Sequence, residues 1–210
     1  MVLLPGLSLA TLESWLARHE VSGIRRGLCR DRGIRGAALA WKGHGLLCAD
    51  AGDSDQEQRF TLAHEAGHYL QQHYYPRRAL LERFGAGIQP VVGGLRPPTT
   101  GERVDAVLGG ATFDLYTHLM ERDYGEFVRA NRHQTAEADA DAFAWEMLAP
   151  RAVLRARFPQ LREGPTAVSQ VAQVLTGEFG LPSVPAERYA RHFVGREAAP
   201  ESVLHRLRLL

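Results

Sequence analysis

The sequence predicts an α+β fold in which a short hairpin comes before a series of helices. Residues 37–41 and 46–49 are apolar and flank the K-G-H-G tip at residues 42–45, where glycines allow the positive φ of a tight turn. Alanine-rich residues 135–148 and the apolar spacing within 166–179 favour helices. With 210 residues and 45% hydrophobic content, the chain can bury one good core, with room for a small satellite domain.

The N-terminal half holds two further predicted helices. Residues 9–20 form the first, which Ser8 or Thr11 opens and which ends before Gly23. Polar residues 50–58 then form a loop that leads into the second helix. Its apolar face is supplied by Phe60, Leu62, Ala63, Ala66, Tyr69 and Leu70.

Residues 74–134 form an insertion between this second helix and the helix at 135–148. Short helical pieces are predicted at 77–84 and 102–108, around a Gly/Pro-rich run at 85–101 that is typical of a loop. A long loop beside a functional site often acts as a lid or a substrate-reading surface. A solvated spacer is the alternative, and the sequence leaves both open.

The C-terminal part is predicted to be helical, with helices at residues 151–158, 166–179 and 186–194. The last two resemble a helix-turn-helix, with four side chains expected to be buried: Ala172, Leu175, Phe179 and Leu181. Three side chains of the final helix could read DNA, namely Arg188, Arg191 and His192, but Glu187 offsets their charge. Packing or docking of a protein partner is therefore favoured over DNA binding.

The segment His64-Glu65-Ala66-Gly67-His68 carries the clearest chemistry, because it is an H-E-x-x-H motif within a predicted helix. Residues four apart share one helix face, so His64 and His68 can bind a single metal ion, zinc or another divalent transition metal. Zinc lowers the pKa of its bound water to about 7. Glu65 lies beside the metal and is predicted to take the proton from that water. A chance match to such a short motif is the alternative.

A catalytic zinc site normally has three protein ligands, so a third is needed. The pattern H-E-x-x-H-x-x-G-x-x-H is excluded, because Gln71 and Tyr74 occupy its last two fixed positions. His73 is rotated away from the ligand face and is interpreted as a surface histidine at the helix end. The third ligand is instead expected on the helix at 135–148, which Thr135 caps and Pro150 ends.

Glu137 and Asp141 are four residues apart on that helix and share a face. Glu137 is the predicted metal ligand. Asp141 is predicted to accept a hydrogen bond from the other ring nitrogen of a ligating histidine. Asp139 is rotated by about 200° from Glu137 and is interpreted as part of an acidic first turn that interacts with the helix dipole.

These residues resemble the ImmA/IrrE family of metallopeptidases. The resemblance rests on R-F-T-L-A-H-E-A-G-H at 59–68, on Glu137 with Asp141, and on M-L-A-P at 147–150, and it covers about residues 36–158 with gaps. The family usually has asparagine where Asp141 stands and methionine where Ala149 stands. Asp141 keeps a hydrogen-bond acceptor, and the E-x-x-x-D spacing also occurs in thermolysin-like enzymes.

The resemblance implies a cytoplasmic bacterial zinc endopeptidase that cleaves a helix-turn-helix repressor of the XRE type. The expected organisation is a zincin-like domain at residues 1–158, which contains the 74–134 insertion, followed by a helical extension at 159–210. By analogy with zincins, residues 46–49 are expected to offer a sheet edge to extended substrate. The residue that stabilises the oxyanion stays unassigned among Tyr116, His118, Tyr124 and His133.

Composition excludes several other classes. A formal net charge of +1 provides no general attraction to nucleic acid. Cys29 and Cys48 are too few for a disulfide scaffold and are expected to be small buried residues in a reducing cytosol. No signal peptide or apolar run of about 20 residues is evident. The remaining alternative is a non-catalytic or DNA-binding regulatory module on the same fold.

Overall fold

The computed structural model describes residues 1–18, 33–41, 44–109, 113, 116–122, 131–161 and 164–195. They confirm the predicted α+β class, with one small four-stranded sheet and helices between and after its strands. The chain divides into two compact units. One comprises Met1–Asp53 and His68–Val128, and the other comprises Ser54–Gly67 and Arg129–Leu210. No helix in the described ranges is long and apolar enough to cross a membrane.

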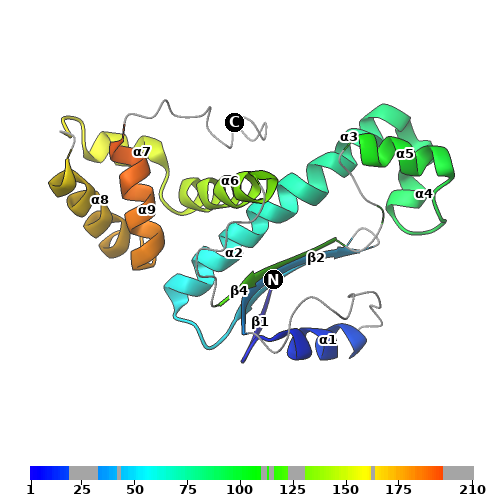
Figure 1. Ribbon diagram of the computed structural model, residues 1–210, viewed down its shortest axis with the longest axis horizontal. Helices are drawn as coiled ribbons and strands as arrows, with labels where there is room; N and C mark the ends of the chain where they lie inside the picture. The colour runs from blue at the N-terminus through cyan, green and yellow to red at the C-terminus, as the bar shows by residue number, and fades with distance from the viewer. Residues whose placement is uncertain are drawn as a thin grey trace. The chain divides into compact units, whose positions relative to one another are not determined.

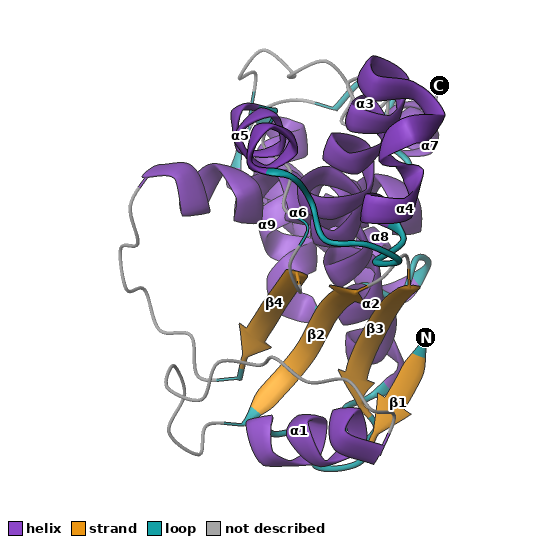
Figure 2. Ribbon diagram, turned by 90° about the vertical axis from the view of Figure 1, so that its right-hand side faces the viewer, coloured by secondary structure: helices purple, strands orange, loops and turns teal. Residues whose placement is uncertain are grey.

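The sheet has the strand order β1-β3-β2-β4 (Figure 2). Its strands are β1 (Val2–Leu4), β2 (Ile34–Trp41), β3 (His44–Asp50) and β4 (Tyr116–Glu121). Strands β2 and β3 are antiparallel and correspond to the predicted hairpin, although residues 42–43 at its tip lie outside the described ranges. Strand β1 runs parallel to β3, and β4 runs antiparallel to β2.

Strand β3 is an inner strand of the described sheet, so the prediction that residues 46–49 provide a sheet edge is wrong for residues 48–49, which β1 covers. Strand β1 pairs with Cys48 through Asp50 on one side, and β2 pairs along the other side. Where a strand has neighbours on both sides, its backbone groups are already paired and cannot bind a substrate. The edges of the described sheet are β1 and β4.

Helix α1 (Leu9–Arg18) confirms the first predicted helix and covers part of the sheet's core. The backbone N–H of Ser8 donates to the hydroxyl of Thr11, and the N–H of Thr11 donates to the hydroxyl of Ser8, which closes the start of the helix. The apolar face of α1 packs with side chains of β2 and β3 in one cluster: Leu7, Leu12, Leu16, Ile34, Ala37, Leu39, Leu46 and Cys48. Cys48 is fully buried, as expected; Cys29 lies outside the described residues.

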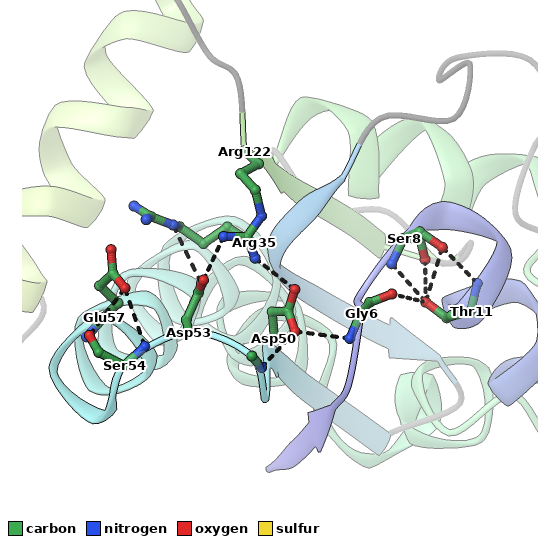
Figure 3. Close-up of polar contacts among 10 residues, drawn as sticks. Gly6, Ser8, Thr11, Arg35, Asp50, Asp53, Ser54, Glu57 and Arg122 are labelled. Atoms are coloured by element: carbon green, nitrogen blue, oxygen red, sulfur yellow. Dashed lines mark hydrogen bonds and ion pairs between the residues drawn. The ribbon is translucent and has the colours of Figure 1, made fainter.

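The turn after β3 is fixed by ion pairs with Arg122, which follows β4 (Figure 3). Asp50 accepts hydrogen bonds from the backbone of Gly6 and Gly52, at 3.0 and 2.9 Å, and from Arg122 at 2.6 Å. Burial raises the pKa of Asp50, but the bonds from Gly52 and Arg122 outweigh it and hold the pKa below its usual range. Arg122 also donates to Asp53, so both ends of the turn are anchored to β4.

Helix α2 (Asp55–Tyr69) begins directly after this turn with a capping box (Figure 3). The hydroxyl of Ser54 accepts from the backbone N–H of Glu57, and the carboxylate of Glu57 accepts from the N–H of Ser54, each at 3.3 Å. Helix α2 passes without a break into the π-helical turn η1 (Leu70–Tyr74) and then into α3 (Tyr75–Phe84). The predicted helix at 77–84 is therefore the later part of α3.

The insertion is more helical than its Gly/Pro content suggests. The expected loop at 85–101 contains η2 (Gly85–Ile88) and α4 (Gln89–Val92), so the loop prediction is wrong for these residues. Pro90 is tolerated because it stands in the first turn of α4, where its missing N–H has no helical partner. Helix α5 (Thr100–Leu108) confirms the predicted helix at 102–108 and starts with a capping box of Thr99 and Glu102.

His73, in η1, is buried and not at the surface, contrary to the prediction. It is 5% exposed, and its ring centroid lies 5.3 Å from that of Tyr69 and 5.6 Å from that of Tyr116. Burial, aided by the charge of Arg77, lowers the pKa of His73 to about 4. The ring is therefore neutral in the folded protein at neutral pH, and the π-helical turn is what brings it inside.

Acid should therefore weaken the fold through His73. Its pKa is lower in the folded state than the ordinary 6.5, so stability is full above pH 6.5 and falls as pH drops towards about 4. The loss between pH 7 and pH 5 is about 2 kcal/mol. We expect His73→Leu to lose much less stability than the wild type when thermal unfolding is compared at these two pH values. Equal losses in both proteins would show that His73 is not held neutral.

The second unit contains α6 (Asn131–Leu148), α7 (Arg151–Arg157), α8 (Pro165–Gly177) and α9 (Ser183–Val194), and these helices confirm the four predicted there (Figure 1). Their common core includes Leu154, Val171, Leu175, Leu181 and Tyr189. The ring of Tyr189 stacks on Trp145 with centroids 5.1 Å apart, and its hydroxyl donates to the carbonyl of Ala149 at 3.0 Å. Helix α9 is thereby packed directly against α6.

Candidate metal centre

Helices α2 and α6 approach closely because a glycine of the H-E-A-G-H segment lies between them. A Cβ atom at Gly67 would lie 3.1 Å from Cα of Ala140 and 3.2 Å from Cβ of Phe143, both in α6. Only a residue without a side chain fits this contact unchanged. Glu137 lies about one turn before Ala140 and Asp141 directly follows it, so the close contact brings both carboxylates towards the histidine face of α2.

His64 is almost fully buried, at 2% exposure, and contacts two carboxylates of α6, those of Glu137 and Asp141. Its Nδ1 lies 3.0 Å from Oδ1 of Asp141, and its Nε2 lies 3.4 Å from Oε2 of Glu137. Burial lowers the pKa of His64, but the hydrogen bonds with Asp141 and Glu137, together with the charges of Asp141 and Glu65, raise it to about 10. A metal at Nε2 would therefore have to displace a proton.

His68 lies one turn after His64 and is also buried. Its Nδ1 lies 3.0 Å from Nε2 of Gln72, and the hydroxyl of Tyr116 donates to the carbonyl oxygen of the same glutamine at 3.0 Å. The ring of His118 stacks on His68 with centroids 3.6 Å apart. The orientation of the His68 ring is thus set by η1 and β4.

His64, His68 and Glu137 together could hold a metal ion, because each offers a ligand atom and these atoms all lie within 4.8 Å of one another. Two imidazoles and a carboxylate are the donor set of a catalytic zinc site with one open position. Two donors bound about 2.1 Å from a tetrahedral ion lie about 3.4 Å apart. The 3.4 Å between His64 and Glu137 already matches this spacing. Glu137 is the exposed member of the group, whereas both histidines are buried.

The remaining candidate residues have distinct positions. Glu65 is fully buried, and its charge acts on His64, but it is not part of the three-residue donor group. Asp139 is also absent from that group, in keeping with its expected rotation away. Of the four oxyanion candidates, His118 stacks on His68, and Tyr116 donates a hydrogen bond to Gln72, which in turn contacts His68. Tyr124 and the side chain of His133 lie outside the described part of the chain.

The sequence offers Tyr116 and His118 only as unassigned oxyanion candidates, and it predicts neither Gln72 nor the contacts of Tyr116 with Gln72 and of His118 with His68. Gln72 lies four residues after His68 in the chain, so its helical spacing was a usable signal. The other two come from β4, and only the pairing of β4 with β2 brings them beside α2.

The contact of Gly67 with α6 gives a test of the geometry. Gly67→Val is expected to destabilise the protein by about 1–3 kcal/mol, because the added methyl groups would overlap the α6 backbone. Gly101→Val is the matched control, since Gly101 lies in helix α5 with open space around it. Chemical denaturation of both variants measures the difference. Equal stabilities would show that α2 and α6 are not in close contact at Gly67.

A comparison with protein-family models, curated proteins and solved structures found no match for this chain.

Proposed function

We propose that this chain is a zinc-dependent endopeptidase of zincin type, similar to the ImmA/IrrE family, that cleaves a helix-turn-helix repressor of the XRE type. The observation that carries the proposal is the group of His64, His68 and Glu137, with Glu65 buried one residue after the first histidine. Three ligands and an adjacent carboxylate are what metal-assisted peptide hydrolysis requires.

The roles of the side chains follow from their positions. A zinc ion held by the three ligands would act as a Lewis acid on water and on the peptide carbonyl. Glu65 accepts the proton of the attacking water and then donates it to the leaving amine. Asp141 can only accept at Nδ1 of His64, so it keeps the proton on that nitrogen and directs Nε2 towards Glu137.

Strand β4 is the better candidate for pairing with an extended substrate, now that β3 is known to lie inside the sheet. It is an edge strand in the described sheet, and its residue His118 stacks on the ligand His68. A peptide added along this strand would extend the sheet by backbone hydrogen bonds.

The DNA-binding alternative has weaker support. Both arginines of α9, which could contact phosphate, lie beside carboxylates of this chain. Arg191 is 2.5 Å from Glu187, and Arg188 is 3.8 Å from Asp141. Tyr189 of the same helix is packed on α6. These contacts favour a packing or docking role for α8 and α9, and the proposed enzyme needs no DNA contact.

The proposed substrate class is tested by incubating the zinc-loaded protein with an XRE-type repressor and, separately, with unfolded casein. We expect one cut in the repressor and little or no digestion of casein. The Glu65→Gln protein, treated identically, excludes cleavage by a contaminant. Rapid digestion of casein with the repressor left intact would contradict a regulatory peptidase and indicate a general one.

A further inference from the structure

The two histidines of the proposed metal centre are supported by different kinds of partner. His64 faces the carboxylate of Asp141, which at neutral pH only accepts hydrogen bonds. His68 faces the carboxamide of Gln72, which has a donor end and an acceptor end. The proton on Nδ1 of His64 is therefore fixed by its partner, whereas the proton of His68 depends on which way the amide points.

The hydrogen bonds that the structure shows place the proton of His68 on the nitrogen that a metal would need. Gln72 presents its NH₂ group to Nδ1 of His68, and its oxygen accepts from the hydroxyl of Tyr116. If Nδ1 accepts, the neutral ring carries its proton on Nε2. A metal binds through a nitrogen lone pair, so this tautomer cannot use Nε2 as a ligand.

A rotation of the Gln72 carboxamide by about 180° would let Nε2 of His68 bind a metal. The oxygen of Gln72 then accepts from Nδ1–H of His68, and the NH₂ group donates to the hydroxyl oxygen of Tyr116. Both contacts survive with donor and acceptor exchanged, and the hydroxyl proton of Tyr116 becomes available to another acceptor. The stacked ring of His118 keeps the plane of His68 in place but does not distinguish its two tautomers.

We propose that Gln72 and Tyr116 are positioning residues that set the tautomer of His68, and that the carboxamide of Gln72 turns over when metal binds. The π-helical turn η1 holds Gln72 one turn beyond His68, and β4 holds Tyr116 against it. The inference rests on the proposed function in one respect only, namely that a metal binds at His68.

The first arm of the test measures zinc affinity by competition with a chelator. Gln72→Met removes the acceptor for Nδ1–H and is expected to weaken zinc binding by about 10–100-fold. Gln72→Glu offers only acceptors and should bind zinc at least as tightly as the wild type. Tyr116→Phe should weaken binding less than Gln72→Met, because it removes only the partner of the amide. Gln71→Met is the matched control and should have the wild-type affinity.

The second arm reads the tautomer directly from the ¹⁵N shifts of the His68 ring. In the wild type the proton is expected on Nε2 without metal and on Nδ1 with zinc. In Gln72→Glu we expect Nδ1 to be protonated in both states, a result that a merely structural role would not produce.

A wild-type protein that binds no zinc would overturn the metal centre itself. Normal zinc binding by Gln72→Met would overturn only the role of Gln72. If His68 of the metal-free wild type is already protonated on Nδ1, the proposed rotation of the Gln72 carboxamide on metal binding is wrong.

Discussion

Glu65→Gln is expected to abolish peptide hydrolysis while the protein keeps its metal and its fold. The amide has nearly the shape of the carboxylate, so the buried position next to His64 stays filled. It cannot accept the proton of water, however, and general-base catalysis of this kind contributes about 100- to 10,000-fold. The measurement is the single-turnover rate of substrate cleavage by zinc-loaded protein.

Zinc content and thermal stability of the same Glu65→Gln sample provide the control. Both should equal the wild-type values, because Glu65 lies outside the group of three donors. Substantial residual cleavage would remove Glu65 from the mechanism. Loss of zinc together with activity would instead place Glu65 among the ligands.

Glu65→Gln is expected to keep its zinc and lose activity. Removing a metal ligand should instead release the zinc, and the loss of activity should follow from that. We expect His64→Ala, His68→Ala and Glu137→Ala each to weaken zinc binding by more than the roughly 10–100-fold that loss of a supporting hydrogen bond costs. Two remaining protein donors do not make the three-ligand site that catalytic zinc needs. Metal analysis after dialysis against a weak chelator measures the effect.

Asp139→Ala is the matched control for Glu137→Ala, because both remove a carboxylate from the same stretch of α6. The three-donor group includes Glu137 and not Asp139, so the control should keep its zinc. Full zinc retention in Glu137→Ala with loss in Asp139→Ala would show that the third ligand was assigned to the wrong carboxylate.

The elements that the sequence predicted correctly are those with a local signal. Helices α2 and α6 carry apolar residues at helical spacing. The two histidines of the H-E-A-G-H segment share a helix face because they are four residues apart. The hairpin of β2 and β3 has turn residues between two apolar runs. In each case the information lies within about 20 neighbouring residues of the chain.

The features that were missed depend on contacts between distant segments. Strand β4 has no apolar alternation strong enough to mark it, and it becomes a strand by pairing with β2, about 80 residues earlier. The same pairing brings Tyr116 to Gln72 and His118 to His68. Strand β1 has three residues, too few for a recognisable pattern, yet its pairing moves β3 into the interior of the sheet.

The prediction of a surface position for His73 is wrong for a different reason. On a regular α-helix it lies about 140° round from His68, and that angle suggested a position at the surface. The structure has a π-helical turn from Leu70 to Tyr74, which changes the direction of the side chains within it. No residue in that turn marks it in the sequence.

We propose that His64, His68 and Glu137 hold one catalytic zinc ion beside Glu65. Anomalous diffraction from crystals of the zinc-loaded protein, recorded on both sides of the zinc absorption edge, tests it most directly. We predict one peak that is present above the edge and absent below it, about 2.0–2.2 Å from a nitrogen of each histidine and an oxygen of Glu137. A zinc-soaked crystal with no peak between these three side chains, or with its zinc bound elsewhere, would contradict the account.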